Sequence, residues 1–155
     1  MNSSTQKICF AASSGGHFEQ LMMLKPLMEK YDSFIITEKT SYESKTTVKS
    51  HYMLQVNRRE ALFIPKMCVN FLKAAKIMAV EKPDVVITTG VLAMIPISIL
   101  AKMCGKKLIY IESFAKVTSA TLTGKLLYKY ADKFYVQWEQ MLKIYPEATF
   151  LGGIY

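Results

Sequence analysis

The chain has 155 residues, 51% of them hydrophobic and 21% charged, which is enough to bury one core and excludes a disordered protein. Its formal net charge of +8 predicts anionic partners such as phosphates or lipid head groups. No basic run interleaved with aromatic residues is present, so we expect no nucleic-acid partner. Cys9, Cys68 and Cys104 lie far apart in apolar segments, which predicts buried free thiols and no metal site.

Strand and helix patterns alternate along the whole chain. The predicted strands are 8–12, 33–37, 52–56, 84–89, 107–112, 133–136 and 149–151, and the predicted helices are 17–30, 62–81, 91–104, 121–131 and 137–145. Two of the strands, 84–89 and 107–112, are largely apolar, as expected of parallel strands covered on both faces. The pattern therefore predicts an α/β fold: a doubly wound, mostly parallel, Rossmann-like sheet in one domain, residues 1–155.

Two segments bear on the relation to a membrane. The first six residues are polar and lead directly into a strand, so we expect no signal peptide. The longest apolar run, 91–101, is shorter than the roughly 20 residues that cross a bilayer. We therefore expect any membrane contact to be peripheral. The polar stretch 38–50 is expected to be a mobile loop.

Ligands of doubly wound sheets bind outside the carboxyl ends of the strands, where the strand order reverses. This rule selects three joints, 13–17, 88–90 and 112–113, which we expect to converge. Gly15 and Gly16 allow a sharp turn and a close approach to a ligand. The helix that follows would point free amide groups into the crevice, which favours a diphosphate. A plain strand-to-helix turn is the alternative.

A nucleotide-binding module of Rossmann type is the competing interpretation. Glu38 ends the second strand, where a ribose-binding carboxylate would lie. The glycine fingerprint of dinucleotide-binding proteins is absent, however, because Gly15 and Gly16 are adjacent and no third glycine follows. The segment 123–125 also lacks the first glycine of a P-loop.

The predicted helix 62–81 has a polar, basic stripe and an apolar stripe. The polar stripe is Lys66, Asn70, Lys73 and Lys76, and the apolar stripe, expected to pack on the sheet, is Ile64, Cys68, Phe71, Leu72, Ala75, Met78 and Ala79. This pattern is typical of an ordinary surface helix. Alternatively, the basic stripe contacts anionic lipid, which stabilises binding by on the order of 1 kcal/mol per lysine.

Several separated motifs resemble a known family. Ser14-Gly15-Gly16-His17, Lys82-Pro83-Asp84-Val85-Val86 and Thr89-Gly90 resemble the acceptor-side, N-terminal half of a GT-B glycosyltransferase. Further motifs lie at 110–117, 122–128, 131–132, 136–138, 143–146 and 150–152. This second series is similar to the membrane-associated subunit of the split N-acetylglucosaminyltransferase that adds the second sugar of the dolichol-linked N-glycan precursor. Similar short chains occur in bacterial capsule and exopolysaccharide synthesis.

The resemblance implies a division of labour between two chains. A subunit of this type binds the membrane and a saccharide on polyprenyl diphosphate, whereas a separate subunit binds the nucleotide sugar. No cofactor is implied. The chain shows no N-terminal membrane helix and ends at Gly153-Ile154-Tyr155 without a second domain of similar size. We therefore expect half of a bacterial enzyme at the cytoplasmic face of the cell membrane, with an undecaprenyl-diphosphate-linked acceptor.

The resemblance also suggests roles for individual residues. A transferase of this kind needs a base for the acceptor hydroxyl, and His17 or Glu112 could take that proton. Glu112 could instead orient backbone amides near Ser113. The candidates for binding the acceptor diphosphate are Ser13, Ser14, Gly15, Gly16, Thr89, Gly90 and Ser113.

The last four residues, Gly152, Gly153, Ile154 and Tyr155, are expected to contact the donor-binding subunit together with the rim 112–118. A free terminus that exposes apolar residues gains nothing, and a partner surface would bury them. The alternative is that this tail packs onto its own domain.

Overall fold

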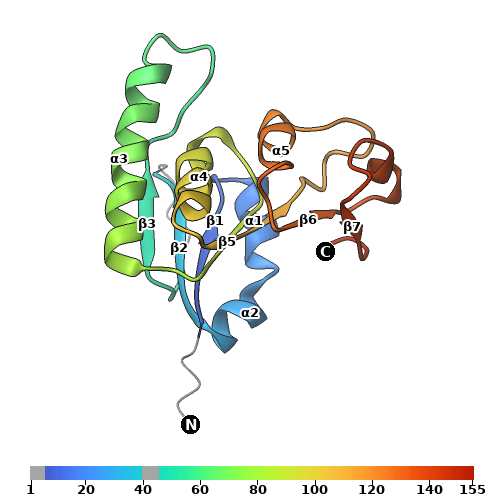
Figure 1. The fold of residues 1–155 in the computed structure, drawn as a ribbon, viewed down its shortest axis with the longest axis horizontal. Helices are drawn as coiled ribbons and strands as arrows, with labels where there is room; N and C mark the ends of the chain where they lie inside the picture. Colours follow the sequence, from blue (N-terminus) through green and yellow to red (C-terminus); the bar gives the residue numbers. More distant parts are fainter. Residues whose placement is uncertain (1–5, 40–45) are drawn as a thin grey trace.

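The computed structural model describes residues 6–39 and 46–155, and Figure 1 shows their arrangement. The strands are β1 (Lys7–Ala11), β2 (Asp32–Glu38), β3 (Ser50–Met53), β4 (Val85–Thr88), β5 (Lys107–Ile111), β6 (Lys133–Val136) and β7 (Thr149–Phe150). The α-helices are α1 (Gly16–Met22), α2 (Lys25–Lys30), α3 (Phe63–Glu81), α4 (Ile95–Met103) and α5 (Leu122–Leu127). Two 3₁₀ helices are η1 (Leu92–Met94) and η2 (Glu139–Lys143). Part of the loop expected to be mobile, 40–45, lies outside the described residues.

The seven strands form one parallel sheet in the order β3-β2-β1-β4-β5-β6-β7, which confirms the predicted Rossmann-like α/β fold. The chain proceeds outward from β1 through β2 to β3 and then returns to the other side of β1 as β4. The strand order therefore reverses between β1 and β4. Their carboxyl ends carry two of the joints that the sequence selects, 13–17 and 88–90.

Alternate residues of the strands supply two separate cores, as the two-residue period of a strand requires. Cys9, Ala11 and Val86 point to the layer formed by α3, α4 and α5. Ile8, Phe10 and Ile87 point to the opposite layer, where Leu21 of α1 and Met28 of α2 cover them. Because both faces are covered, the central strands are apolar without interruption.

Two predicted elements differ from the structure for local reasons. The helix expected over 17–30 is two short helices, α1 and α2, because Pro26 has no N–H to continue the ladder and its ring would collide with the preceding turn. The strand expected at 52–56 ends earlier, at Met53. There the Asn70 side chain takes over the backbone pairing, since it accepts from the Leu54 N–H (2.8 Å) and donates to the Leu54 carbonyl (2.9 Å).

The C-terminal helical patterns also form less helix than expected. The pattern at 121–131 gives α5 alone, and the pattern at 137–145 gives the 3₁₀ helix η2. The pattern at 91–104 is helical nearly throughout, as η1 followed by α4.

The orientation of α3 contradicts the prediction. Asn70 is buried, whereas most of the predicted apolar stripe, including Ile64, Cys68 and Leu72, faces away from the protein. The polar residue lies inside because Leu54 satisfies its hydrogen bonds. Cys68 and Cys104 are exposed, so the expectation of buried thiols holds for Cys9 alone. Among the described residues, no helix combines the length and apolarity that membrane crossing requires.

Candidate functional site

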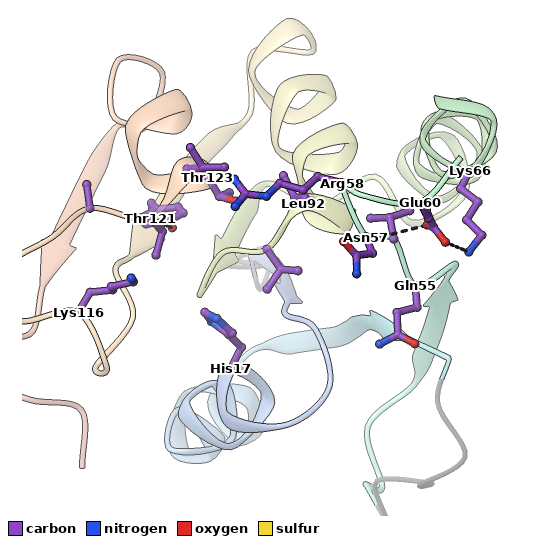
Figure 2. A pocket seen from close by; sticks show the side chains of 15 residues that line it. His17, Gln55, Asn57, Arg58, Glu60, Lys66, Leu92, Lys116, Thr121 and Thr123 are labelled. Atoms are coloured by element: carbon purple, nitrogen blue, oxygen red, sulfur yellow. Dashed lines mark hydrogen bonds and ion pairs between the residues drawn. The ribbon is translucent and has the colours of Figure 1, made fainter. Parts of the chain in front are cut away.

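A cavity of about 750 Å³ opens at the carboxyl ends of the strands. Its walls come from the start of α1, the loop between β3 and α3, the turn after β4, and the segment between β5 and α5. Figure 2 shows the lining residues, which are His17, Gln55, Val56, Asn57, Arg58, Glu60, Lys66, Val91, Leu92, Tyr110, Lys116, Ala120, Thr121, Leu122 and Thr123. The cavity thus lies where the topology predicts a ligand, at the reversal of strand order.

His17 is the predicted catalytic residue that lines this cavity, and Figure 2 shows its ring pointing inward. Its Nδ1 lies 2.8 Å from the Thr89 carbonyl oxygen. A carbonyl can only accept, so Nδ1 carries the proton and donates it to that bond. In the neutral imidazole this bond leaves the lone pair on Nε2. This nitrogen can accept a proton from a hydroxyl group bound in the cavity.

Thr89 and Gly90 contact residues that line the cavity but do not line it themselves. The Thr89 Oγ1 donates to the carbonyl of His17 (3.0 Å), so Thr89 holds this histidine by two hydrogen bonds. Gly90 has φ 98°, and a Cβ there would lie 2.7 Å from the Tyr110 hydroxyl. Only glycine fits this position, because a side chain would be both strained and in collision.

The turn at residues 13–16 lies beside the cavity. Gly15 has φ 75°, a conformation that favours glycine, and its carbonyl accepts from the Phe18 and Glu19 amides. Ser13 is buried, whereas Gly15 and Gly16 are exposed. Because α1 has only 7 residues, its amino terminus attracts a diphosphate less than a long helix would. Diphosphate binding by Ser13, Ser14, Gly15 and Gly16 stays a prediction.

The side chain of Glu38 binds the backbone of this turn. Its carboxylate is buried and accepts hydrogen bonds from the backbone N–H groups of Ser14 and Val56. Burial raises the pKa of Glu38, and the two backbone bonds oppose that rise. Because Glu38 is only 5% exposed and its carboxylate binds the backbone, the geometry does not favour the nucleotide-binding alternative.

Glu112 lies in the protein interior and does not line the cavity, contrary to its expected place on the rim. Only 1% of the residue is exposed. Its Oε1 accepts from the Ser113 N–H and from Thr121 Oγ1 (both 2.9 Å), and its Oε2 accepts from the Tyr145 hydroxyl (2.9 Å). The carboxylate therefore joins the two ends of the segment between β5 and α5. This is the orienting alternative stated above, and it includes Ser113.

The Glu112 cluster extends into the start of α5. Thr121 caps this helix, because its Oγ1 accepts from the Gly124 N–H (2.9 Å) while donating to Glu112. Burial raises the pKa of Tyr110 and of Tyr145, and the Glu112 carboxylate raises both further. The cluster fixes the position of Thr121, and through it one wall of the cavity.

Two cations of the cavity, Arg58 and Lys116, were not among the predicted site residues. Figure 2 shows Arg58 extending from the loop before α3 toward Thr123, and Lys116 pointing in from the opposite wall. Lys66 also lines the cavity, but it pairs with Glu60 at 2.7 Å, a contact that lowers the pKa of this glutamate. The cavity therefore holds three cations and one carboxylate.

The predicted membrane lysines lie on α3 in two settings. Lys66 faces the cavity, as described above. Lys73 and Lys76 line a smaller cavity of about 260 Å³ beside β3, together with His51, Tyr52, Ile77 and Val80.

The predicted interface residues do come together, at the β7 end of the sheet. Ile154 donates its N–H to Gln137 Oε1 (2.9 Å) and packs on the core of the α1 layer. The ring of Tyr155 contacts that of Phe114 on the rim, with centroids 5.0 Å apart. A Cβ at Gly153 would lie 3.2 Å from the same ring. The tail thus packs partly onto its own domain, as the alternative expected, while Leu151 and Tyr155 stay exposed. Among the residues that the structure covers, no group of His, Cys, Asp and Glu side chains is placed to bind a metal.

Comparisons with known proteins agree with this fold. The family described as "Oligosaccharide biosynthesis protein Alg14 like" matches residues 8–154. The UDP-N-acetylglucosamine transferase subunit ALG14 of Candida albicans is 27% identical over 161 residues, covering 90% of this chain and 74% of the relative. The same subunit of Yarrowia lipolytica is 27% identical over 175 residues, covering 96% and 81%.

One solved structure shows the extent of the fold. MurG of Acinetobacter baumannii superposes with a TM-score of 0.71 at 16% identity, over 87% of this chain. The chain spans 42% of that structure. It therefore has the fold of less than half of MurG.

Proposed function

The chain belongs to the family of Alg14-like oligosaccharide biosynthesis proteins, and from this premise we propose that it is the acceptor-side subunit of a two-chain glycosyltransferase. It would bind a saccharide carried on polyprenyl diphosphate and present one hydroxyl group of that saccharide to a sugar donor held by a second chain. The names of the two relatives support the coarser part of this proposal, because both are subunits of a transferase.

The cationic cavity is the observation that carries the proposal. Arg58 and Lys116 approach it from opposite walls, which suits a ligand with two phosphate groups. The ring of His17 faces the same space, and its neutral form has the lone pair on Nε2. One cavity thus offers cations for a diphosphate and a base for a hydroxyl group, the two requirements of the proposed acceptor.

The reaction would proceed by proton transfer and displacement. His17 Nε2 takes the proton of the acceptor hydroxyl as its oxygen attacks the anomeric carbon of the donor sugar. The bond from that carbon to the nucleotide diphosphate breaks, and the nucleotide diphosphate leaves with the bonding electrons. Thr89 stabilises the resulting imidazolium, because its carbonyl accepts from Nδ1.

The donor site would belong to the second chain. The tail at 152–155 and the rim around Phe114 lie together and expose Leu151 and Tyr155, which supports a docking surface at this end of the sheet. We place the complex at the cytoplasmic face of a bacterial cell membrane, in capsule or exopolysaccharide synthesis. This part of the proposal rests on the sequence resemblance, since the two relatives named above are yeast proteins.

A binding experiment tests the acceptor site. We expect the protein to bind farnesyl-diphosphate-linked N-acetylglucosamine, measured by calorimetry, more tightly than it binds UDP-N-acetylglucosamine. Arg58→Ala should weaken binding of the former about tenfold or more, because a lost hydrogen bond between charged groups costs roughly 1.5–3 kcal/mol. Arg59→Ala is the matched control, since Arg59 is an exposed neighbour that does not line the cavity. Tighter binding of the nucleotide sugar would support the nucleotide-binding alternative instead.

A further inference from the structure

The outer face of α3 is an exposed apolar surface. Asn70, Ala74 and Ile77 face the protein, whereas large apolar side chains lie on the opposite side of the helix. The exposed large apolar residues of this segment are Leu62, Ile64, Val69, Phe71, Leu72 and Val80. Leu72 and Ile64 are 71% and 65% exposed, more than most apolar side chains of the described chain. An apolar surface of this extent on a helix indicates a binding face.

Part of this surface is a line of side chains along the helix axis. Ile64, Cys68 and Leu72 follow one another at intervals of four residues, so they lie one above the other on one face. With a rise of about 1.5 Å per residue, this line from Ile64 to Leu72 is about 12 Å long. Figure 1 shows α3 at the edge of the molecule, with this length unobstructed by any other helix.

Lysines accompany the apolar line. Lys73 and Lys76 line the smaller cavity on the β3 side of the helix, and Lys66 lines the large cavity near the start of the helix. A helix with an apolar face bordered by lysines is suited to the interface of a bilayer, where the side chains enter the acyl region and the lysines meet lipid phosphates. A second copy of the chain fits less well, because it would bring the same lysines and another net charge of +8 to the contact.

The start of α3 also borders the large cavity. Lys66 lines that cavity, and Leu62 and Ile64 are exposed beside it. On the other side, Leu122 of α5 lines the cavity and is exposed as well. In Figure 1, α5 and the start of α3 lie at the same, upper end of the molecule. The mouth of the cavity thus has exposed apolar residues on both sides.

We propose that the outer face of α3 inserts into the surface of an anionic bilayer and that this contact holds the mouth of the cavity at the level of the lipid head groups. The second part rests on the proposed function. A polyprenyl chain would remain in the membrane while its diphosphate enters the cavity. Membrane binding would then depend on the insertion of apolar side chains as well as on the attraction of lysines to lipid phosphates.

The two exposed cysteines allow a matched experiment in the full-length chain. Cys68 lies on the proposed face, Cys104 follows α4, and Cys9 is buried. An environment-sensitive fluorophore is attached to Cys68 in a Cys104→Ser variant, and to Cys104 in a Cys68→Ser variant. We expect mixed phosphatidylcholine and phosphatidylglycerol vesicles to shift the emission of the Cys68 probe to the blue and to leave the Cys104 probe unchanged.

Any other result of this experiment would overturn the proposed insertion of α3. Vesicle binding without a shift at Cys68, or with equal shifts at both probes, would place the contact elsewhere. A shift that follows protein concentration without lipid would identify a second copy as the occupant, and a shift that requires the donor-binding chain would identify that partner. An absence of vesicle binding would exclude a membrane contact.

Unlabelled variants give a second measurement. Ile64→Asp together with Leu72→Asp should lower sedimentation with the mixed vesicles about tenfold or more, because charged side chains are expelled from the acyl region. Met103→Asp, at an exposed apolar residue of α4, is the control and should bind normally. Transfer to the farnesyl-linked acceptor in the absence of lipid should survive the double substitution. Vesicle binding without any sugar transfer would leave the membrane inference standing and refute the proposed function.

Discussion

His17 has two ring nitrogens with different tasks, and this division gives a prediction at the scale of one residue. Nδ1 anchors the ring to Thr89, and Nε2 is left for the acceptor hydroxyl. His17→Ala should lower turnover of the two-chain complex by about 10²–10⁴, the usual effect of a positioned base, with little change in Tm. Gln55→Ala removes another side chain of the cavity, one that cannot act as a base, and it should retain most of the activity.

Near-normal turnover of the His17 variant would assign this residue a structural role or a phosphate contact. Glu112→Gln is then the informative comparison, because it keeps the shape of the side chain and removes its charge. The buried position of Glu112 predicts that this substitution lowers Tm together with activity, since an amide NH₂ would face hydrogen-bond donors.

Gly124 gives a stability test of the same cluster. A Cβ at this position would overlap the Glu112 carboxylate and would lie 2.6 Å from the Tyr145 hydroxyl. Alanine normally stabilises a helix relative to glycine by about 1 kcal/mol. Here the overlap should prevail, so that Gly124→Ala destabilises the protein by about 1–3 kcal/mol in urea unfolding.

Gly16→Ala is the matched control for this stability test. Gly16 also lies in the first turn of a helix, but nothing occupies the space of its missing Cβ. This substitution should leave stability unchanged or raise it. Equal effects of the two alanine substitutions would refute the packing that the structure shows around Glu112.

The lowered pKa of Glu81 predicts how the free energy of unfolding depends on pH. Its side chain is 2% exposed, and hydrogen bonds from Lys49, Lys7 and His51 lower its pKa from 4.5 to about 2 against the opposing effect of burial. A pKa that is lower in the folded state stabilises the protein above pH 4.5, and this stabilisation is lost as the pH falls toward 2. The contribution is on the order of 3 kcal/mol.

Urea unfolding at a series of pH values measures this contribution. Glu81→Gln should lower the free energy of unfolding at neutral pH and flatten its decline between pH 4.5 and 2. Glu29→Gln, at an exposed glutamate of α2, should reproduce the wild-type curve. Parallel curves for the wild type and the Glu81 variant would contradict the assignment.

At the scale of elements, the sequence predicted correctly those features of the fold that depend on local patterns of apolar residues. The apolar runs of β4 and β5 and the alternation with helices were sufficient for the parallel sheet. The predicted buried face of α3 was wrong because two polar residues of this helix are buried and bind partners far away in the chain. Asn70 binds Leu54, and Glu81 binds Lys7. A prediction from apolar periodicity assigns such polar residues to the solvent-facing side, and it therefore assigned the wrong face of α3 to the protein interior.

The candidate site shows the same limit of local reasoning. The position of His17 followed from the strand-end rule and from its neighbours in sequence. Lys116 reaches the cavity from a segment, 113–121, whose course depends on the buried Glu112 carboxylate that binds both of its ends, and Arg58 reaches it from a turn held by the pairing of Asn57 with Glu60. The burial of Glu112 depends on Thr121 and Tyr145, which no local pattern connects to it.

The lysines of α3 give a prediction for this helix as an element. Replacing Lys66, Lys73 and Lys76 together with alanine should weaken binding to anionic vesicles by up to roughly a hundredfold, at about 1 kcal/mol for each lysine near the surface. The remaining binding should depend less on salt, because exposed charges are screened over about 10 Å at 0.1 M. Sedimentation with vesicles at several salt concentrations measures both effects.

A second triple variant controls for net charge. Lys25, Lys30 and Lys107 lie on α2 and β5, so their replacement removes the same charge from elements other than α3. This control should bind vesicles nearly as well as the wild type. Equal losses in the two triple variants would mean that net charge, and not the α3 face, determines binding.

At the scale of the whole molecule, the two ends of the sheet differ in what they expose. The β3 end carries α3 with its apolar outer face, and the β7 end exposes Leu151 and Tyr155 beside the rim. Gln137 connects the tail to the interior, because it accepts from the Ile154 N–H and donates to the Glu112 carbonyl and to Gln20. A partner bound at the tail would therefore contact a hydrogen-bond network that extends to the segment between β5 and α5. This segment forms one wall of the cavity.

This connection predicts the effect of removing residues 152–155. The truncated chain should co-purify poorly with the donor-binding chain and should support little sugar transfer, because both the exposed tail and the anchor of Ile154 are lost. Tyr155→Ala combined with Leu151→Ser separates these causes, since it removes exposed side chains and leaves Ile154 in place. Loss of co-purification in this variant would assign the interface to the exposed surface. The full-length chain should transfer sugar only with its partner, and robust transfer by the chain alone would refute the two-chain proposal.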